Sequence, residues 1–211
     1  MQKNMTEVRG FKCWGSHIGI KSKRRDLAII FSEQESSAAA VFTRNLVKAE
    51  PIKISQKNIK DGKARAIVAN AGNANACTGE QGRKGAEAMV NTAAKELDIE
   101  PTEVLIASTG IIGETFPTAK VIKGIKESVT YLSDRVVAGS LAANAILTTD
   151  TFPKEDFINF KVDGKEINLG GIAKGSGMIH PDMGTMLAFI ICDIAITSEL
   201  LDKALRDCVD E

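Results

Sequence analysis

The residue types best suited to chemistry gather in four short segments rich in glycine and in small hydroxyl or amide residues. Each segment follows an apolar stretch, and the four are residues 70–79, 107–113, 148–151 and 170–177. Glycine permits close approach of the backbone and positive φ angles, while Ser, Thr and Asn offer neutral hydrogen-bonding groups. Together such loops suit a pocket for a polar ligand. Taken singly, each is more often an ordinary tight turn.

The last of these segments places Lys174 and Ser176 among glycines, which raises the question of a phosphate site. Neither a GxxxxGK[ST] nor a GxGxxG spacing is present, and Pro181 follows where a phosphate loop would lead into a helix. Lys174 is therefore either a solvated loop lysine or a point charge for a substrate carboxylate.

Thr185 follows Gly184 at the head of an almost continuous apolar segment. A threonine in that position is in most cases a β-branched residue that starts a strand. A catalytic role would need a base for its weakly nucleophilic hydroxyl, and His180 beside Pro181 is more often a surface or capping residue. If Thr185 became a chain N-terminus, its own α-amine, with a pKa of about 7.7–8.0, would take the hydroxyl proton.

Cysteine and histidine patterns give no indication of a metal site. The four cysteines form no CxxC pair, and the chain has two histidines, so we expect no bound zinc. The N-terminus lacks the apolar core of a signal peptide, and no run approaches the roughly 20 apolar residues that span a bilayer. We expect a cytoplasmic protein with reduced thiols and no membrane partner.

Composition points to a small-molecule partner. The 211 residues include 27 Lys and Arg against 27 Asp and Glu. Without a charge excess there is no electrostatic case for binding nucleic acid or an anionic membrane. A chain of this length can bury one sizeable core or two small ones.

The elements that must hold these segments alternate between strand and helix. Apolar stretches predict strands, and helical spacing predicts helices over 79–97, 120–131 and 133–146, with Thr197 capping one more. The strands are expected at 26–31, 38–42, 64–70, 104–107 and 186–196. Asp163-Gly164 between residues 157–162 and 165–169 predicts a type I′ hairpin turn. Interleaved helices and an antiparallel hairpin favour an α/β sandwich with mixed sheets, without a secure domain boundary.

Residues 171–189 read GIAKGSGMIHPDMGTMLAF. This stretch resembles the self-cleavage and nucleophile motif of the ornithine acetyltransferase family, the bifunctional glutamate N-acetyltransferases of arginine biosynthesis. Further matches follow the family's order, and the resemblance runs from about residue 10 to the end of the chain; the matching segments are residues 26–30, 40–45, 70–79, 107–113 and 148–154. Separated motifs in one order are far more specific than one glycine-rich loop, and they make Thr185 a candidate nucleophile.

The resemblance implies that the precursor cuts itself between Gly184 and Thr185. Residues 1–184 would then form an α chain and 185–211 the beginning of a β chain, held together in the same fold rather than as independent domains. Most family members have alanine before the threonine and asparagine after the proline, where this chain has Gly184 and Asp182. Both departures bear on the rate of cleavage.

The resemblance also implies the activity and its residues. The family moves an acetyl group from N-acetylornithine to glutamate through an acetyl-threonine. Thr109 and Gly110 match the family's oxyanion pair, while Thr148, Lys174 and Thr185 match its substrate-binding residues. No metal or cofactor is implied, and acetyl-CoA remains open as a second acetyl donor. The family's fold is a sandwich of two sheets between helical layers, like that of the N-terminal-nucleophile hydrolases.

Family chains continue well beyond the residues matched here, so the expected assembly is an α/β hetero-oligomer with the remainder of the β chain. We also expect the 211 residues alone to transfer acetyl groups poorly. Two other functions stay open at this point. An N-terminal-nucleophile amidase or aminopeptidase would use Thr185 with water as acceptor, and its acetyl release would not depend on glutamate. A non-catalytic amino-acid-binding fragment would stay uncut.

Overall fold

The computed structural model describes residues 3–177 and 186–209. Its first sheet has the strand order β1-β2-β3-β4, comprising β1 Phe11–Ser16, β2 Leu27–Ser32, β3 Ala66–Asn73 and β4 Val104–Ile111. The β1/β2 and β2/β3 pairs are antiparallel, and the β3/β4 pair is parallel. This sheet is therefore mixed, as the sequence predicts.

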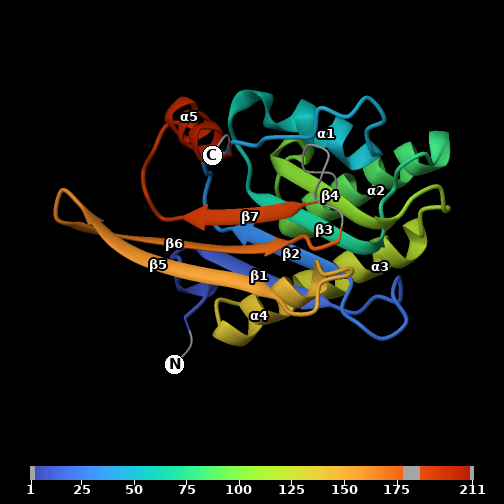
Figure 1. Cartoon of the computed structure of the whole chain (residues 1–211), viewed down its shortest axis with the longest axis horizontal. Coiled ribbons are helices and arrows are strands. Elements are labelled where there is room, and N and C mark those ends of the chain that lie inside the picture. The colour runs from blue at the N-terminus through green and yellow to red at the C-terminus, as the bar shows by residue number, and fades with distance from the viewer. Residues whose placement is uncertain (1–2, 178–185, 210–211) are drawn as a thin grey trace.

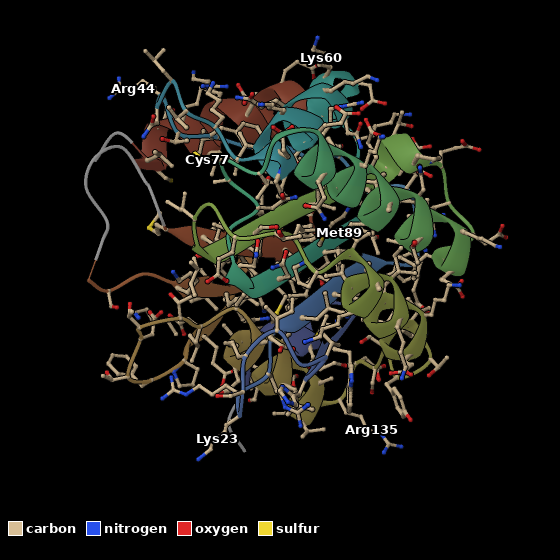
Figure 2. All side chains as sticks on the ribbon, turned by 90° about the vertical axis from the view of Figure 1, so that its right-hand side faces the viewer. Lys23, Arg44, Lys60, Cys77, Met89 and Arg135 are labelled. Atoms are coloured by element: carbon tan, nitrogen blue, oxygen red, sulfur yellow. The ribbon has the colours of Figure 1, made fainter. Side chains whose placement is uncertain are left out.

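Helices cover one face of this sheet (Figure 1). They are α1 Glu50–Asn58, α2 Gly79–Leu97 and α3 Thr118–Val129. Strand residues such as Ile29 and Val68 pack there against Met89 of α2 and Ile125 of α3, all fully buried. Figure 2 shows Met89 between α2 and the strands, whereas Lys60 and Arg135 project outward. Burial of this apolar layer provides the main driving force for folding of this half.

A second sheet lies against the other face together with α4 Val136–Ala145. Its order is β5-β6-β7, with β5 Lys154–Val162, β6 Lys165–Lys174 and β7 Leu187–Cys192, all antiparallel. Ile30 of β2, Ala142 of α4 and Ile172 of β6 share this second core. On the outer face, Ile158, Phe160, Val162 and Ile190 are exposed in the described structure. The two sheets thus sandwich a core, which confirms the predicted α/β class.

Short helices complete the described chain. Three 3₁₀ turns are η1 Met5–Glu7, η2 Ile59–Asp61 and η3 Pro101–Glu103. Helix α5, Ser198–Val209, follows Thr197, whose Oγ1 accepts a hydrogen bond from the backbone N–H of Leu200 at 3.4 Å. The predicted cap is confirmed. No helix among residues 3–177 and 186–209 is both long and apolar enough to cross a bilayer.

Most local predictions hold. Helix α2 has the predicted bounds, and Asp163 and Gly164 have the positive φ angles, 48° and 77°, of a type I′ turn. The strand expected at 38–42 is wrong. Ala38 donates its backbone N–H to the carbonyl of Gly62 and Ser37 forms an isolated bridge, so this apolar segment runs past a turn instead of joining a sheet.

The last predicted strand is too long, because β7 ends at Cys192 rather than 196. The next residue, Asp193, turns its carboxylate to Asn168, accepting that residue's backbone N–H at 2.7 Å and its Nδ2 at 2.8 Å. The backbone N–H of Asp193 still donates to the carbonyl of Asn168 at 3.2 Å, but the Asn168 N–H is taken by the Asp193 side chain, and β7 ends at this point. The sequence predictions also miss β1 and α1.

Candidate active site

The candidate oxyanion residues lie where β3 and β4 end side by side. Gly110 pairs with Gly72, and the register shifts at Asn73. Both glycines have positive φ angles, 134° for Gly110 and 110° for Gly72, and a Cβ on Gly110 would overlap backbone atoms of Gly72. Only glycine fits this crossing. Thr109 is 1% exposed, whereas Gly110 is exposed.

The buried lysine of the second sheet meets this corner. Lys174, the last residue of β6, is 4% exposed, and its Nζ donates a hydrogen bond to Thr109 Oγ1 at 3.3 Å across 65 residues of sequence. Burial lowers the pKa of Lys174; the charge of Asp150 raises it, and that of Lys154 lowers it further. Because Thr109 Oγ1 accepts this bond, its own hydroxyl proton is available to a second acceptor.

The Thr148 turn is tied to the same end of β6 through a buried carboxylate. Asp150 Oδ2 accepts the backbone N–H of Thr148 at 3.4 Å, and Oδ1 accepts that of Gly175 at 2.9 Å. Lys154 Nζ lies 2.6 Å from Oδ1. Burial alone would raise the pKa of Asp150, but these donors hold it down at about 2. Asp150 is therefore ionised at neutral pH and fixes the turn.

The structure thus brings together Thr109, Gly110 and Lys174, with Thr148 joined to them through Asp150. Gly184, Thr185 and His180 lie outside the described residues. Leu187, two positions after Thr185 in sequence, pairs with Lys174 in the β6/β7 ladder. A hydroxyl, an exposed glycine backbone and a buried ammonium in one place suit an anionic, oxygen-rich ligand or reaction intermediate.

The polar segment 70–79 has a structural role. Asn70 Nδ2 donates to the carbonyl of Asn73, Asn73 Oδ1 accepts the backbone N–H of Asn75, and Thr78 Oγ1 donates to Asn75 Oδ1. Other amide atoms of this segment reach further, since Asn70 Oδ1 accepts the hydroxyl of Ser108 in β4 and Asn73 Nδ2 donates to the carbonyls of Glu114 and Thr115. The segment is therefore more than a local turn, because its side chains fix the end of β3 against β4 and residues 114–115.

Asp150 is the site residue that sequence reasoning overlooks. It lies inside the predicted segment 148–151, but there it is one acidic residue among threonines. The signal that could have found it is the lysine at position 154, because opposite charges so near in sequence can pair outside a helix as well.

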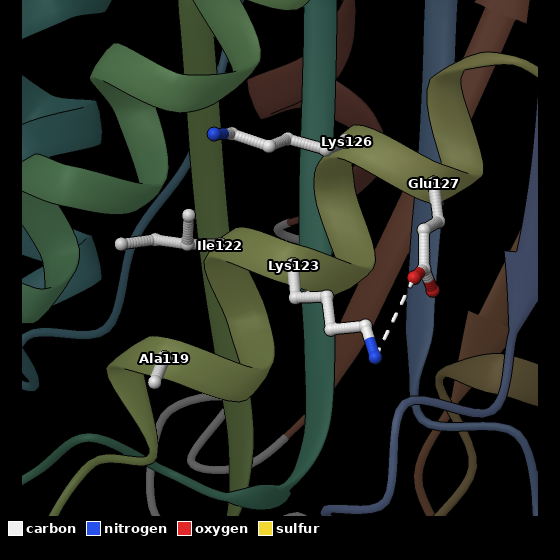
Figure 3. Close-up of a pocket in the computed structure, with 5 residues that line it drawn as sticks. All are labelled: Ala119, Ile122, Lys123, Lys126 and Glu127. Carbon is white, nitrogen blue, oxygen red and sulfur yellow. Dashed lines mark ion pairs between the residues drawn. The ribbon is translucent and has the colours of Figure 1, made fainter.

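Other candidate ligand sites are weak. A shallow hollow is lined by Ala119, Ile122, Lys123, Lys126 and Glu127, all from α3, with Lys123 Nζ 3.7 Å from Glu127 (Figure 3). Because one helix supplies the whole lining, this is a surface groove apart from the β3/β4 corner. In the described part of the chain, no group of three or more His, Cys, Asp or Glu residues could hold a metal ion.

Comparison with known proteins identifies relatives along nearly the whole chain. The model of the ArgJ family matches residues 12–211. The arginine biosynthesis bifunctional protein ArgJ of Caldanaerobacter subterraneus subsp. tengcongensis is 48% identical over 202 residues, which cover 96% of this chain and 50% of that protein. The chain therefore spans about half the length of the curated relatives it matches.

Solved structures of two such proteins resemble the fold of this chain. Arginine biosynthesis bifunctional protein ArgJ from Bacillus halodurans superposes with a TM-score of 0.82 at 40% identity, over 88% of this chain and 95% of that one. Ornithine acetyltransferase from Mycobacterium tuberculosis, complexed with ornithine, gives 0.76 at 35% identity over 88% and 96%. An Ochrobactrum anthropi aminopeptidase, described as a variant of the Ntn hydrolase fold, gives 0.57 at 10% identity and shows likeness of fold alone.

Proposed function

The chain belongs to the ArgJ family, and on that premise we propose that it transfers acetyl groups from N-acetylornithine to glutamate through an acetyl-threonine at Thr185. The threonine is freed by self-cleavage between Gly184 and Thr185. That cut divides the polypeptide into an α chain, 1–184, and a β chain that begins with 185–211. The two products stay associated in one fold and assemble with the remainder of the β chain as an α/β hetero-oligomer.

The observation that carries this proposal is the buried contact between Lys174 Nζ and Thr109 Oγ1 beside Gly110. Lys174 is 4% exposed and places a positive charge in this corner, and a ligand that brings negative charge interacts favourably with an ammonium held in such a place. The α-carboxylate common to ornithine and glutamate supplies that charge. One lysine can then serve both donor and acceptor substrates, with the Thr148 hydroxyl as a further hydrogen-bonding group. The likeness to an ornithine-bound relative supports this assignment.

In the proposed reaction the Thr185 α-amine takes the proton from Oγ, and Oγ attacks the acetyl carbonyl of N-acetylornithine. The Thr109 hydroxyl and the Gly110 backbone N–H donate to the oxygen as it becomes negative. Donors of this kind contribute about 2.7–4 kcal/mol each to transition-state stabilisation. Ornithine leaves, and the glutamate amine then takes the acetyl group from Thr185.

Self-cleavage uses the same hydroxyl. Thr185 Oγ attacks the carbonyl carbon of Gly184 through a five-membered ring, the peptide nitrogen leaves as an amine, and water hydrolyses the resulting ester. The β6/β7 pairing of Lys174 with Leu187 supports a position for this peptide bond near the site, because only one residue separates Leu187 from Thr185 in sequence.

Intact mass spectrometry tests the cleavage. The wild-type chain should give two products that divide between Gly184 and Thr185, Thr185→Ser should cut more slowly, and Thr185→Ala should stay whole. A cut in Thr185→Ala would exclude Thr185 as the nucleophile of cleavage.

Transfer is tested with labelled N-acetylornithine. Because the chain spans half the length of its relatives, it is assayed alone and together with the remaining half of the Caldanaerobacter relative. Label should appear on glutamate and briefly on the fragment that begins with Thr185. Acetate release that is independent of glutamate would replace the proposal with an amidase. If acetyl-CoA is supplied in place of N-acetylornithine, appearance of its acetyl group on glutamate would establish acetyl-CoA as a second donor.

A further inference from the structure

Lys21 lies in the loop between β1 and β2, outside every segment that the sequence assigns to the site. A buried carboxylate fixes this loop. Asp26, fully buried, accepts the backbone N–H groups of Ile18 at 2.6 Å, Ile20 at 2.7 Å and Lys21 at 2.9 Å. Three donors converging on one carboxylate hold the backbone of Lys21 in a defined position.

The head of the Lys21 side chain reaches the turn that carries Thr148. Its Nζ donates to the carbonyl oxygen of Leu147 at 2.9 Å, across 126 residues of sequence. Figure 1 shows the β1–β2 loop, in blue, near the connection from α4 to β5. Leu147 directly precedes Thr148, so this bond holds the turn from the side opposite Asp150.

The stem of Lys21 lies against the oxyanion corner. A Cβ placed on Gly72 would be 2.9 Å from Lys21 Cγ, so the methylene chain lies directly over the Gly72 backbone. Gly72 in turn is in contact with Gly110, where a Cβ would overlap it. One side chain therefore spans from the backbone behind Gly110 to the carbonyl before Thr148.

Charges from two parts of the fold, the β1–β2 loop and β6, act on this amine. Burial lowers the pKa of Lys21 to about 8; Asp26 of the same loop raises it, while Arg24 of that loop and Lys174 of β6 lower it. Lys174 thus lies close enough to Lys21 for its positive charge to lower the pKa of Lys21. The Lys21 ammonium is charged at neutral pH and loses its proton in mildly alkaline solution.

We propose that Lys21 is a positioning residue of the acyl-transfer site, which fixes the Thr148 turn relative to the Thr109–Gly110 corner and adds a second positive charge beside Lys174. The name of the reaction rests on the proposed function, but the positioning itself does not. Lys21 acts through Gly72 and Leu147, and its effect reaches both substrate binding and stabilisation of the oxyanion.

Three variants separate the contributions of Lys21. Lys21→Arg keeps a donor and a permanent charge, Lys21→Gln keeps a donor without charge, and Lys21→Met keeps only the stem. The matched control is Lys120→Met, because Lys120 Nζ also donates to a backbone carbonyl of the same loop, that of Gly19 at 2.7 Å, from α3.

The first measurement needs no activity. Amide NMR spectra of the chain should show shifts at Thr148 and Gly110 in Lys21→Met and smaller ones in Lys21→Gln. The spectrum of Lys120→Met should show no shift at either the Thr148 or the Gly110 amide. Well-dispersed spectra establish that the variants fold. Unchanged Thr148 and Gly110 amides in folded Lys21→Met, or equal changes in Lys120→Met, would overturn the positioning role.

The second measurement is ornithine affinity against pH, by calorimetry on the chain completed with the remaining half of its relative. Lys21→Met should bind ornithine about tenfold more weakly, because it loses the positive charge beside Lys174 and the bond that holds the Thr148 turn. Lys21→Arg should match the wild type at neutral pH and bind more tightly than it above pH 8, where the wild-type amine loses its charge. A constant ratio of these two affinities across pH would refute the charge contribution.

Transfer kinetics distinguish the two proposals. If acetyl transfer occurs, Lys21→Met should lower kcat as well as raise KM, since both ends of its contact are disturbed. If transfer is absent in the wild type while the amide shifts and affinity changes are present, the proposed function fails and the positioning role stands. Normal kcat and KM in Lys21→Met would overturn the positioning role even if transfer occurs.

Discussion

Replacing Asp150 with asparagine should loosen the buried junction between the Thr148 turn and the end of β6. Oδ1 of Asp150 receives both Lys154 and the backbone N–H of Gly175, and Oδ2 receives that of Thr148. Asparagine keeps one acceptor oxygen but presents N–H donors at the other position. The variant therefore leaves Lys154 without its carboxylate. It also places the N–H group of the asparagine amide against another N–H donor.

The size of the effect follows from the acidity of Asp150. Although burial opposes ionisation, the hydrogen bonds of Lys154, Gly175 and Thr148 lower the pKa from 3.8 to about 2. That difference corresponds to about 2 kcal/mol of stability, at about 1.4 kcal/mol per pKa unit. Because the folded state binds the proton less tightly, this stability is complete above about pH 5 and is lost as the pH falls through 3.8 toward 2.

The assay is urea unfolding followed by fluorescence of Trp14, the single tryptophan, which stacks on Tyr131. Asp150→Asn should lower the free energy of unfolding by about 2 kcal/mol at pH 6 and by only about 1 kcal/mol at pH 3. Asp156→Asn makes the same charge change at an exposed position of β5 and should cost less than about 0.5 kcal/mol. A loss of equal size at both pH values would show that the charge of Asp150 contributes nothing.

Further predictions concern the corner, the division of roles and the thiols. Gly110→Ala should destabilise the chain by more than 2 kcal/mol in thermal unfolding, whereas Gly113→Ala, also at positive φ but in open space, should cost about 1 kcal/mol; equal costs would contradict the close contact. In the completed enzyme, Thr109→Ala should chiefly lower kcat and Lys174→Ala chiefly raise KM for both amino acids, and an unchanged KM would exclude the carboxylate role. Cys77→Ala should retain transfer, and loss of activity with normal folding would reveal a thiol function.

Patterns that depend on neighbouring residues are predicted well. Helix α2 is recovered because its alanine, methionine and valine residues repeat with helical period, and the β5–β6 turn because Asp163-Gly164 suits two consecutive positive φ angles. Strand β1 is missed because it is short, with glycine and lysine among its six residues. Helix α1 begins at Glu50-Pro51 with a largely polar sequence, so its period is weak.

The site is harder to derive, because its contacts join distant parts of the sequence. Thr109, Gly110, Thr148 and Lys174 can be named from resemblance, yet no local pattern places Lys174 Nζ on Thr109 Oγ1. Lys21 gives still less signal, since it is one of four basic residues in a loop. Its importance depends on the absence of a side chain at Gly72, which only the packed structure reveals.

The hydrogen bond between Lys174 and Thr109 joins two sheets that have no strand in common. Closing a contact over 65 residues costs chain entropy that neither sheet can recover before the two dock. Thr109 belongs to one sheet and Lys174 to the other, so their contact exists only when both sheets are folded and docked. We therefore expect completion of the site late in folding, so that chemistry that requires both residues begins only in the fully packed chain.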